Sequence, residues 1–104
     1  MTVARALDGR ISAIIGTHTH VPTADEQILP NGTAYLSDVG MCGPSGGILG
    51  VSSEVMIERS RTHLRIPYAE AAGPIVANAC LVELDETSGR ACAIRRLCIR
   101  EGDI

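Results

Sequence analysis

The chain has 104 residues and a formal net charge of −3, so it is large enough for one small domain. All nine basic residues are Arg, without a basic run or interleaved aromatics, which argues against a nucleic-acid polymer as partner. Apolar residues make up 45% of the sequence, yet Phe and Trp are absent and only two Tyr occur. Because such a core buries little area per side chain, we expect a homo-oligomer or part of a larger assembly.

The apolar stretches are short compared with a membrane span of roughly 20 residues, the longest being Ile11–Gly16 and Ile75–Leu84. The N-terminus soon turns polar and is not typical of a signal peptide. We therefore expect no membrane partner and a cytoplasmic location. None of the four cysteines has CxxC spacing, so we expect reduced thiols rather than zinc ligands, with Cys80, Cys92 and Cys98 buried as small apolar side chains.

The first half of the chain predicts three strands and a glycine-rich loop. Ile11–Gly16 is typical of a short buried strand, and Gln27–Leu29 and Thr33–Val39 flank the turn signal Pro30-Asn31-Gly32. These two strands are therefore expected to form a hairpin. Residues 40–50 hold five glycines, and we expect a loop whose backbone approaches another group closely.

The second half predicts the main helix and a second hairpin. The helix opens at Ser52-Ser53-Glu54 and continues to His63, with Arg side chains in its last turns. The apolar runs Ile75–Leu84 and Arg90–Ile99 surround a polar turn at residues 85–89. The whole pattern, about five strands and one main helix, predicts a β-rich α+β fold in a single domain over residues 1–104.

The strongest chemical signal is the run Gly16-Thr17-His18-Thr19-His20, directly after the first predicted strand. If the chain stays extended, the side chains of His18 and His20 lie on the same side. Two neutral imidazoles can then bind one metal ion, or one ion each of a two-metal centre. Surface histidines, or histidines hydrogen-bonded within a loop, give the same spacing, so the pattern alone leaves both interpretations open.

Other polar residues lie near this pair in the sequence. Thr17 and Thr19 flank the histidines and can orient neighbouring groups. Asp25 follows soon after, and Asp38 ends the second strand of the predicted hairpin, next to the glycine-rich loop. The alternative for both carboxylates is that they cap turns.

Several segments together resemble one protein family. They are Gly16–Val21, Thr23–Glu26, Ile28–Pro30, Gly32–Tyr35, Asp38–Met41 and Gly43-Pro44. These segments closely resemble the C-terminal part of the YmdB-like bacterial metallophosphoesterases. Members of that family are calcineurin-like enzymes that hydrolyse 2′,3′-cyclic nucleotides and related phosphoesters. The resemblance extends over nearly the whole chain.

The resemblance implies a four-layer α/β/β/α sandwich, of which this chain is the C-terminal portion, and a two-metal centre of iron or manganese. His18 and His20 match the last two histidine ligands of the family motif. The substrate implied is a phosphoester or a cyclic nucleotide. Residues placed by the resemblance near the substrate or behind the metal ligands are Thr17, Thr19, Asp25, Asp38, Gly40, Met41 and Gly43.

Family proteins are considerably longer and carry the other metal ligands and the catalytic acid in an N-terminal half that has no match here. Two neutral imidazoles cannot offset the charge of two divalent ions, because no carboxylate ligand accompanies them. We therefore expect an inactive C-terminal piece of a metallophosphoesterase, with no catalytic residue of its own. The alternative is a non-catalytic, self-associating interaction module derived from the same family.

Overall fold

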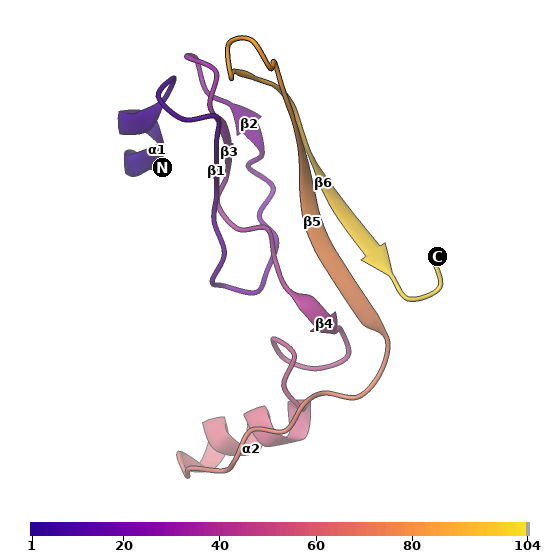
Figure 1. Ribbon diagram of the computed structural model, residues 1–104. Helices are drawn as coiled ribbons and strands as arrows, with labels where there is room; N and C mark the ends of the chain where they lie inside the picture. Colours follow the sequence, from indigo (N-terminus) through magenta and orange to yellow (C-terminus); the bar gives the residue numbers. More distant parts are fainter. Residues whose placement is uncertain (104) are drawn as a thin grey trace. The chain divides into compact units, whose positions relative to one another are not determined.

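The computed structural model describes residues 1–103 and has two three-stranded sheets and two helices, a small α+β fold (Figure 1). In chain order the elements are α1 (Thr2–Leu7), β1 (Ala13–Ile15), β2 (Gln27–Ile28), β3 (Ala34–Leu36), β4 (Cys42–Pro44), α2 (Ser53–Thr62), β5 (Ile75–Leu84) and β6 (Ala91–Arg100). The chain divides into two compact units. The first comprises residues 1–40 and 78–97, and the second comprises residues 41–77 and the end of the chain from residue 98.

The predicted pattern of about five strands and one main helix omits two short elements of the described residues, α1 and β4. Helix α1 has six residues, of which only Ala4 is buried, so it leaves no apolar periodicity in the sequence. Strand β4 lies in the segment predicted as an irregular loop. It pairs antiparallel with β5, with Cys42 opposite Ala77, although Gly43 and Pro44 disfavour strands.

The first sheet has the strand order β1-β3-β2. Strand β1 is parallel to β3, with Ala13 opposite Ala34, and β2 is antiparallel to β3, which confirms the first predicted hairpin. All three residues of the central strand β3 are buried. Tyr35 packs with Ala4 and Leu29 in the core of the first unit, so one of the two tyrosines does contribute to the core.

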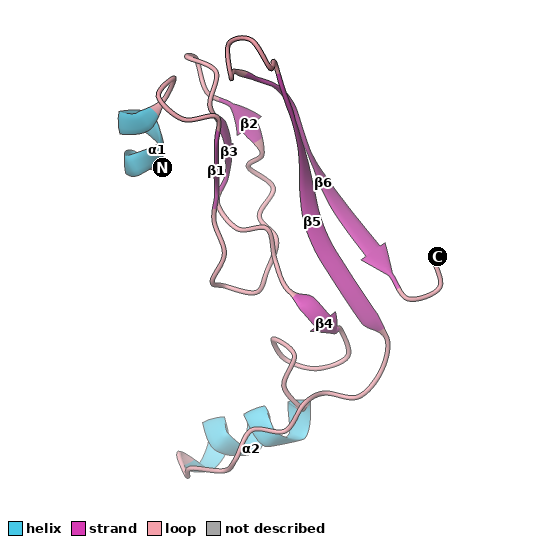
Figure 2. Cartoon of the chain, in the orientation of Figure 1, coloured by secondary structure: helices cyan, strands magenta, loops and turns pink. Residues whose placement is uncertain are grey.

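The second predicted hairpin is confirmed as β5 and β6, which Figure 2 shows as the longest strands. The Asp85 N–H donates to the Arg90 carbonyl at 2.8 Å and closes the turn between them. The expected burial of the cysteines is wrong, because Cys92 and Cys98 are exposed and Cys80 is half-buried. Strand β6 lies at the edge of its sheet, and only one of its ten residues is buried.

Helix α2 of the second unit confirms the predicted main helix. The Ser52 hydroxyl at its start donates to the Glu54 carboxylate at 2.7 Å, and His63 ends it in a left-handed conformation with φ of 57°. The Arg59 guanidinium stacks on the Tyr68 ring, 4.2 Å from its centre, and bonds the Ile66 carbonyl. Neither helix within residues 1–103 has the length and apolar character that crossing a bilayer requires.

The buried apolar core is small. It comprises Ala4, Leu29, Ala34, Tyr35, Leu36, Val76 and Ala91. Large apolar side chains remain in contact with solvent over both units, among them Val3 at 66%, Leu64 at 64% and Leu84 at 49% exposed. A chain with so little buried area draws little stability from its own core. That agrees with the expectation of a partner, although oligomerisation itself stays a prediction.

Candidate metal centre

The loop that carries the two histidines leaves β1 at a point of very close backbone contact. The Gly16 N–H donates to the Leu36 carbonyl at 2.9 Å, and the Gly16 carbonyl accepts from the Val39 N–H at 2.9 Å. A Cβ atom at Gly16 would lie 1.9 Å from the Ser37 carbonyl oxygen. Only glycine fits here. The absence of a side chain at Gly16 allows the start of the loop to lie directly against β3.

A buried carboxylate then holds the middle of the loop. Asp38 is only 3% exposed, and its Oδ2 atom accepts the Thr19 N–H at 2.6 Å and the Thr19 hydroxyl at 2.8 Å. Its Oδ1 atom accepts the Gly40 N–H at 2.8 Å. Because Thr19 lies between the two histidines, Asp38 fixes the backbone from which both imidazoles extend.

The histidines themselves are exposed and do not continue the strand. The chain bends over residues 18–21, with φ of 157° at His18 and 67° at His20. The left-handed conformation of His20 is unfavourable for a residue with a Cβ atom, and such conformations cluster at functional sites. An extended chain would place both imidazoles on the same side. This loop is not extended, so that expectation does not apply to it.

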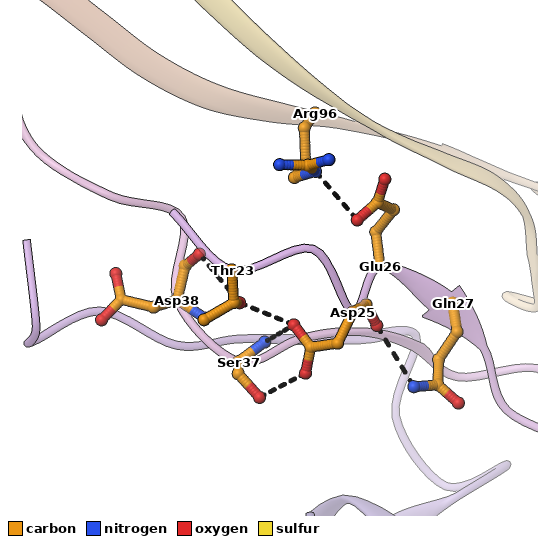
Figure 3. Close-up of polar contacts among 7 residues, drawn as sticks. All are labelled: Thr23, Asp25, Glu26, Gln27, Ser37, Asp38 and Arg96. Atoms are coloured by element: carbon orange, nitrogen blue, oxygen red, sulfur yellow. Dashed lines mark hydrogen bonds and ion pairs between the residues drawn. The ribbon is translucent and has the colours of Figure 1, made fainter. Parts of the chain in front are cut away.

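Asp25 is the centre of a second polar cluster, drawn in Figure 3. Its carboxylate accepts the Ser37 hydroxyl, the Ser37 N–H at 3.2 Å and the Thr23 hydroxyl at 2.6 Å. Thr23 also joins the two clusters, since its hydroxyl accepts the Asp38 N–H at 3.0 Å. In Figure 3 the Asp25 carboxylate points toward Ser37, whereas the Asp38 carboxylate points away from this group.

Hydrogen bonds keep both carboxylates ionised. The Ser37 hydroxyl, followed by that of Thr23, lowers the pKa of Asp25 from 3.8 to about 2. The backbone N–H groups of Gly40 and Thr19 hold the pKa of Asp38 below its ordinary value. The charge of each carboxylate faces hydroxyl and amide donors of the chain itself, which is how charges removed from water are normally stabilised.

The other residues expected near the site separate into two groups. Gly40 lies beside Asp38, and a Cβ atom there would come within 3.0 Å of the Pro22 side chain. Thr17 is exposed in the histidine loop. Met41 and Gly43 belong to the second unit, where the Met41 side chain lies against Gly43 and Gly50.

The residues present do not form a complete metal centre. No group of three or more His, Cys, Asp or Glu side chains that could hold a metal ion occurs within residues 1–103. An imidazole ligand brings no negative charge to a metal ion, and the neighbouring carboxylates of Asp25 and Asp38 bind protein donors instead. A two-metal site with a net charge close to zero needs further anionic ligands from outside this chain.

Thr23 and Ser37 are the structural residues that the sequence reasoning did not single out. The spacing Thr23-Ala24-Asp25 carries a local signal, because a hydroxyl two residues from a carboxylate commonly closes a turn. The contact of Ser37 with Asp25 follows only from the pairing of β2 with β3. The ion pair between Glu26 and Arg96, 2.9 Å from Oε2 to Nε, has no sequence signal at all (Figure 3).

Comparisons with known proteins place this arrangement in a family. The 2′,3′-cyclic-nucleotide 2′-phosphodiesterase of Bacillus subtilis (strain 168) is 46% identical over 94 residues, which cover 90% of this chain and 36% of that enzyme. The crystal structure of a hypothetical protein from Thermus thermophilus matches with a TM-score of 0.91 and 40% identity, covering 97% of this chain and 39% of that one.

A novel phosphatase from Mycoplasma pneumoniae matches with a TM-score of 0.90 and 34% identity, covering 95% of this chain and 36% of that one. The chain therefore spans a little over a third of the length of these relatives. The family profile described as YmdB-like protein matches residues 1–97. On this match over nearly its whole length, the chain belongs to the YmdB-like protein family.

Proposed function

We propose that this chain supplies the histidine-bearing portion of a metal-dependent phosphoesterase of the cyclic-nucleotide phosphodiesterase or phosphatase type. The observation that carries the proposal concerns Thr19, which lies between the two exposed histidines. Its N–H and hydroxyl donate hydrogen bonds to the buried carboxylate of Asp38. The similarity to a 2′,3′-cyclic-nucleotide 2′-phosphodiesterase supports a cyclic nucleotide or related phosphoester as substrate. The chain alone is inactive in this proposal.

In this proposal His18 and His20 are ligands of a divalent metal, iron or manganese, in a two-metal centre. The carboxylate ligands and the catalytic acid belong to the portion of the relatives that this chain does not match. Asp38 positions the histidine loop, while Thr17, Thr19, Asp25 and Gly40 of the same unit support the ligands or line the substrate side. The chain is then one partial domain, the C-terminal portion of a four-layer α/β/β/α sandwich. The proposed location of the protein is the cytoplasm.

The test is a hydrolysis assay with manganese on a 2′,3′-cyclic nucleotide and on bis-p-nitrophenyl phosphate. The chain alone should give no turnover. Adding the complementary N-terminal portion of the Bacillus subtilis relative as a separate polypeptide should restore turnover. His18→Ala and His20→Ala should each abolish the restored activity, whereas Arg95→Gln on exposed β6 should not. Turnover by the chain alone that disappears in His18→Ala contradicts its inactivity.

A second candidate is favoured by the exposed apolar side chains, including Ile57 at 59% and Leu64 at 64%. A self-associating, non-catalytic module would cover such surface with further copies of itself. Light scattering combined with metal analysis separates the two proposals. A metal-free oligomer that the complementary portion does not activate supports the module. Bound metal that depends on both histidines, together with restored turnover, supports the enzyme.

A further inference from the structure

Three turns of the first unit meet at the end of β1 opposite the histidines. They are Asp8–Arg10, Pro30–Gly32 and Ser88–Arg90, which lie before β1, between β2 and β3, and between β5 and β6. Each contains a glycine with positive φ, 82° at Gly9, 97° at Gly32 and 72° at Gly89. Three segments far apart in sequence thus each turn through a glycine in a positive-φ conformation.

The three turns are fastened to one another by hydrogen bonds and close packing. The Asp8 carboxylate accepts the N–H of Asn31 at 2.9 Å, and the Ala91 N–H donates to the Gly32 carbonyl at 2.8 Å. A Cβ atom at Gly32 would lie 2.9 Å from Cγ of Arg90, so the Arg90 stem lies directly over this glycine. The turns therefore form one fixed surface rather than three independent loops.

Between the turns lies a polar pocket of about 100 Å³. It is lined by Gly9, Arg10, Ile11, Ser12, Asn31, Gly32, Ser88, Gly89 and Arg90. This volume corresponds to about three water molecules and suits one small polyatomic ion or group. The residues that line the pocket carry two guanidinium groups and no carboxylate, so their chemistry favours an anion.

The two arginines that line this pocket form no ion pair with the described part of the protein. Within residues 1–103 the ion pairs are Arg61 with Glu58 and Arg96 with Glu26, so neither Arg10 nor Arg90 has an acidic partner there. Two acidic residues of these connecting segments, Asp8 and Asp85, bind other groups. Asp8 accepts the N–H of Asn31, and Asp85 accepts the hydroxyl and N–H of Ser88.

We propose that this pocket, called here the three-turn pocket, binds a phosphate group between Arg10 and Arg90. The lining side chains of Arg10, Arg90, Ser12 and Asn31 together carry more hydrogen-bond donors than a planar carboxylate can accept. A tetrahedral dianion uses donors that arrive from several directions. Its source is inorganic phosphate or the end of a phosphomonoester, and both present the same oxygens. The site requires no metal and does not rest on the proposed function.

The test is a titration of the ¹⁵N-labelled full chain with inorganic phosphate, followed by NMR at constant ionic strength with EDTA present. Millimolar phosphate should cause saturable shifts of the amide signals of Gly9, Ser12, Gly32 and Gly89. A parallel titration with phenyl phosphate identifies the source. Equal affinity points to the phosphate group alone, whereas a stronger response to the ester points to a phosphomonoester. Failure of both probes to saturate overturns the proposal.

Variants make the assignment specific. Arg10→Gln and Arg90→Gln should each weaken phosphate binding about tenfold, since each removes charge-assisted hydrogen bonds, and the double variant should not saturate. Arg95→Gln, an exposed arginine of β6 outside the pocket, is the matched control and should bind as the unchanged chain does. His18→Ala should also leave binding unchanged, which separates this site from the proposed metal site. Saturable shifts that persist in a folded double variant, or that chloride reproduces at equal ionic strength, contradict the proposal.

Discussion

The two ends of the β1-β3-β2 sheet differ in the charged side chains that lack a partner of opposite charge or a hydrogen-bond donor in the protein. At the end where β1 stops, the carboxylates of Asp25 and Asp38 accept hydroxyl and amide hydrogens from the loops around them. At the other end, where β1 starts, Arg10 and Arg90 line a pocket without an acidic partner in the described residues. The carboxylates at the first end are hydrogen-bonded within the protein, and so is Asp8 at the second end, whereas the two arginines have no acidic partner in the described residues.

This difference suggests separate roles: the carboxylates position loops, and the arginines bind a ligand. The buried Asp38 carboxylate already accepts three hydrogen bonds from the protein, so we expect it to act by holding Thr19 in place. A guanidinium without an acidic partner can accept an anion directly. Binding of an anion to the first unit is therefore expected at Arg10 and Arg90, and the carboxylates of Asp25 and Asp38 are expected to act through the loops that they hold.

The largest expected effect comes from adding a methyl group at the carboxylate end. Gly16→Ala places a Cβ atom 1.9 Å from the Ser37 carbonyl oxygen, and because both partners are backbone, β1 and β3 must move apart. We expect the midpoint of thermal unfolding to fall by about 15 °C or more. Circular dichroism melting measures this midpoint.

The matched control is Gly89→Ala at the other end of the sheet. A Cβ atom there meets only the Ser12 hydroxyl at an ordinary 3.5 Å, so its cost is the left-handed backbone alone. We expect a decrease of about 5 °C. Equal decreases for the two variants contradict the close approach of β1 to β3.

A smaller decrease is expected when one carboxylate oxygen of Asp38 is replaced. Asp38→Asn puts an amide NH₂ group or a single neutral oxygen where the charged carboxylate now meets donors from Thr19 and Gly40. We expect a decrease of about 10 °C, measured by thermal melting, with faster hydrogen exchange at the Thr19 amide.

Asp85→Asn is its control, because Asp85 also accepts three donors, from Thr87 and Ser88, but is exposed to water. Water replaces lost hydrogen bonds at an exposed site, so a decrease of only a few degrees is expected. If Asp85→Asn lowers the midpoint as much as Asp38→Asn, burial is not the reason that Asp38 matters.

The elements that the sequence predicts correctly are those with local signals. The hairpin around Asn31-Gly32 has a turn dipeptide, and α2 has a serine start and a stop before Pro67. Helix α1 and strand β4 have no such signal, since one buried residue supports the helix and distant pairing with β5 supports the strand. Exposure of Cys92 depends on which strand lies at the sheet edge, which alternation in the sequence does not encode.

The site is predictable to a similar extent. The run of His18, Thr19 and His20 after a strand is visible in the sequence, and so is the presence of acidic residues nearby. The bond from Thr19 to Asp38 joins residues 19 positions apart, and it exists only because β1 and β3 run parallel, which brings both loops to the same sheet end. Sequence spacing therefore finds the histidines but not the residue that holds their loop.

The smallest effect is expected from acid titration of Asp25. Its pKa is lowered from 3.8 to about 2, so its hydrogen bonds with Ser37 and Thr23 stabilise the folded state fully above pH 4 and are lost as the pH falls toward 2. Asp25→Asn should lower the midpoint by about 5 °C at pH 7 and by less at pH 2, where the unchanged chain has also lost the charge. The measurement is the difference between the two midpoints as a function of pH. A difference that stays constant between pH 2 and pH 5 shows that the Asp25 charge does not stabilise the carboxylate end of the sheet.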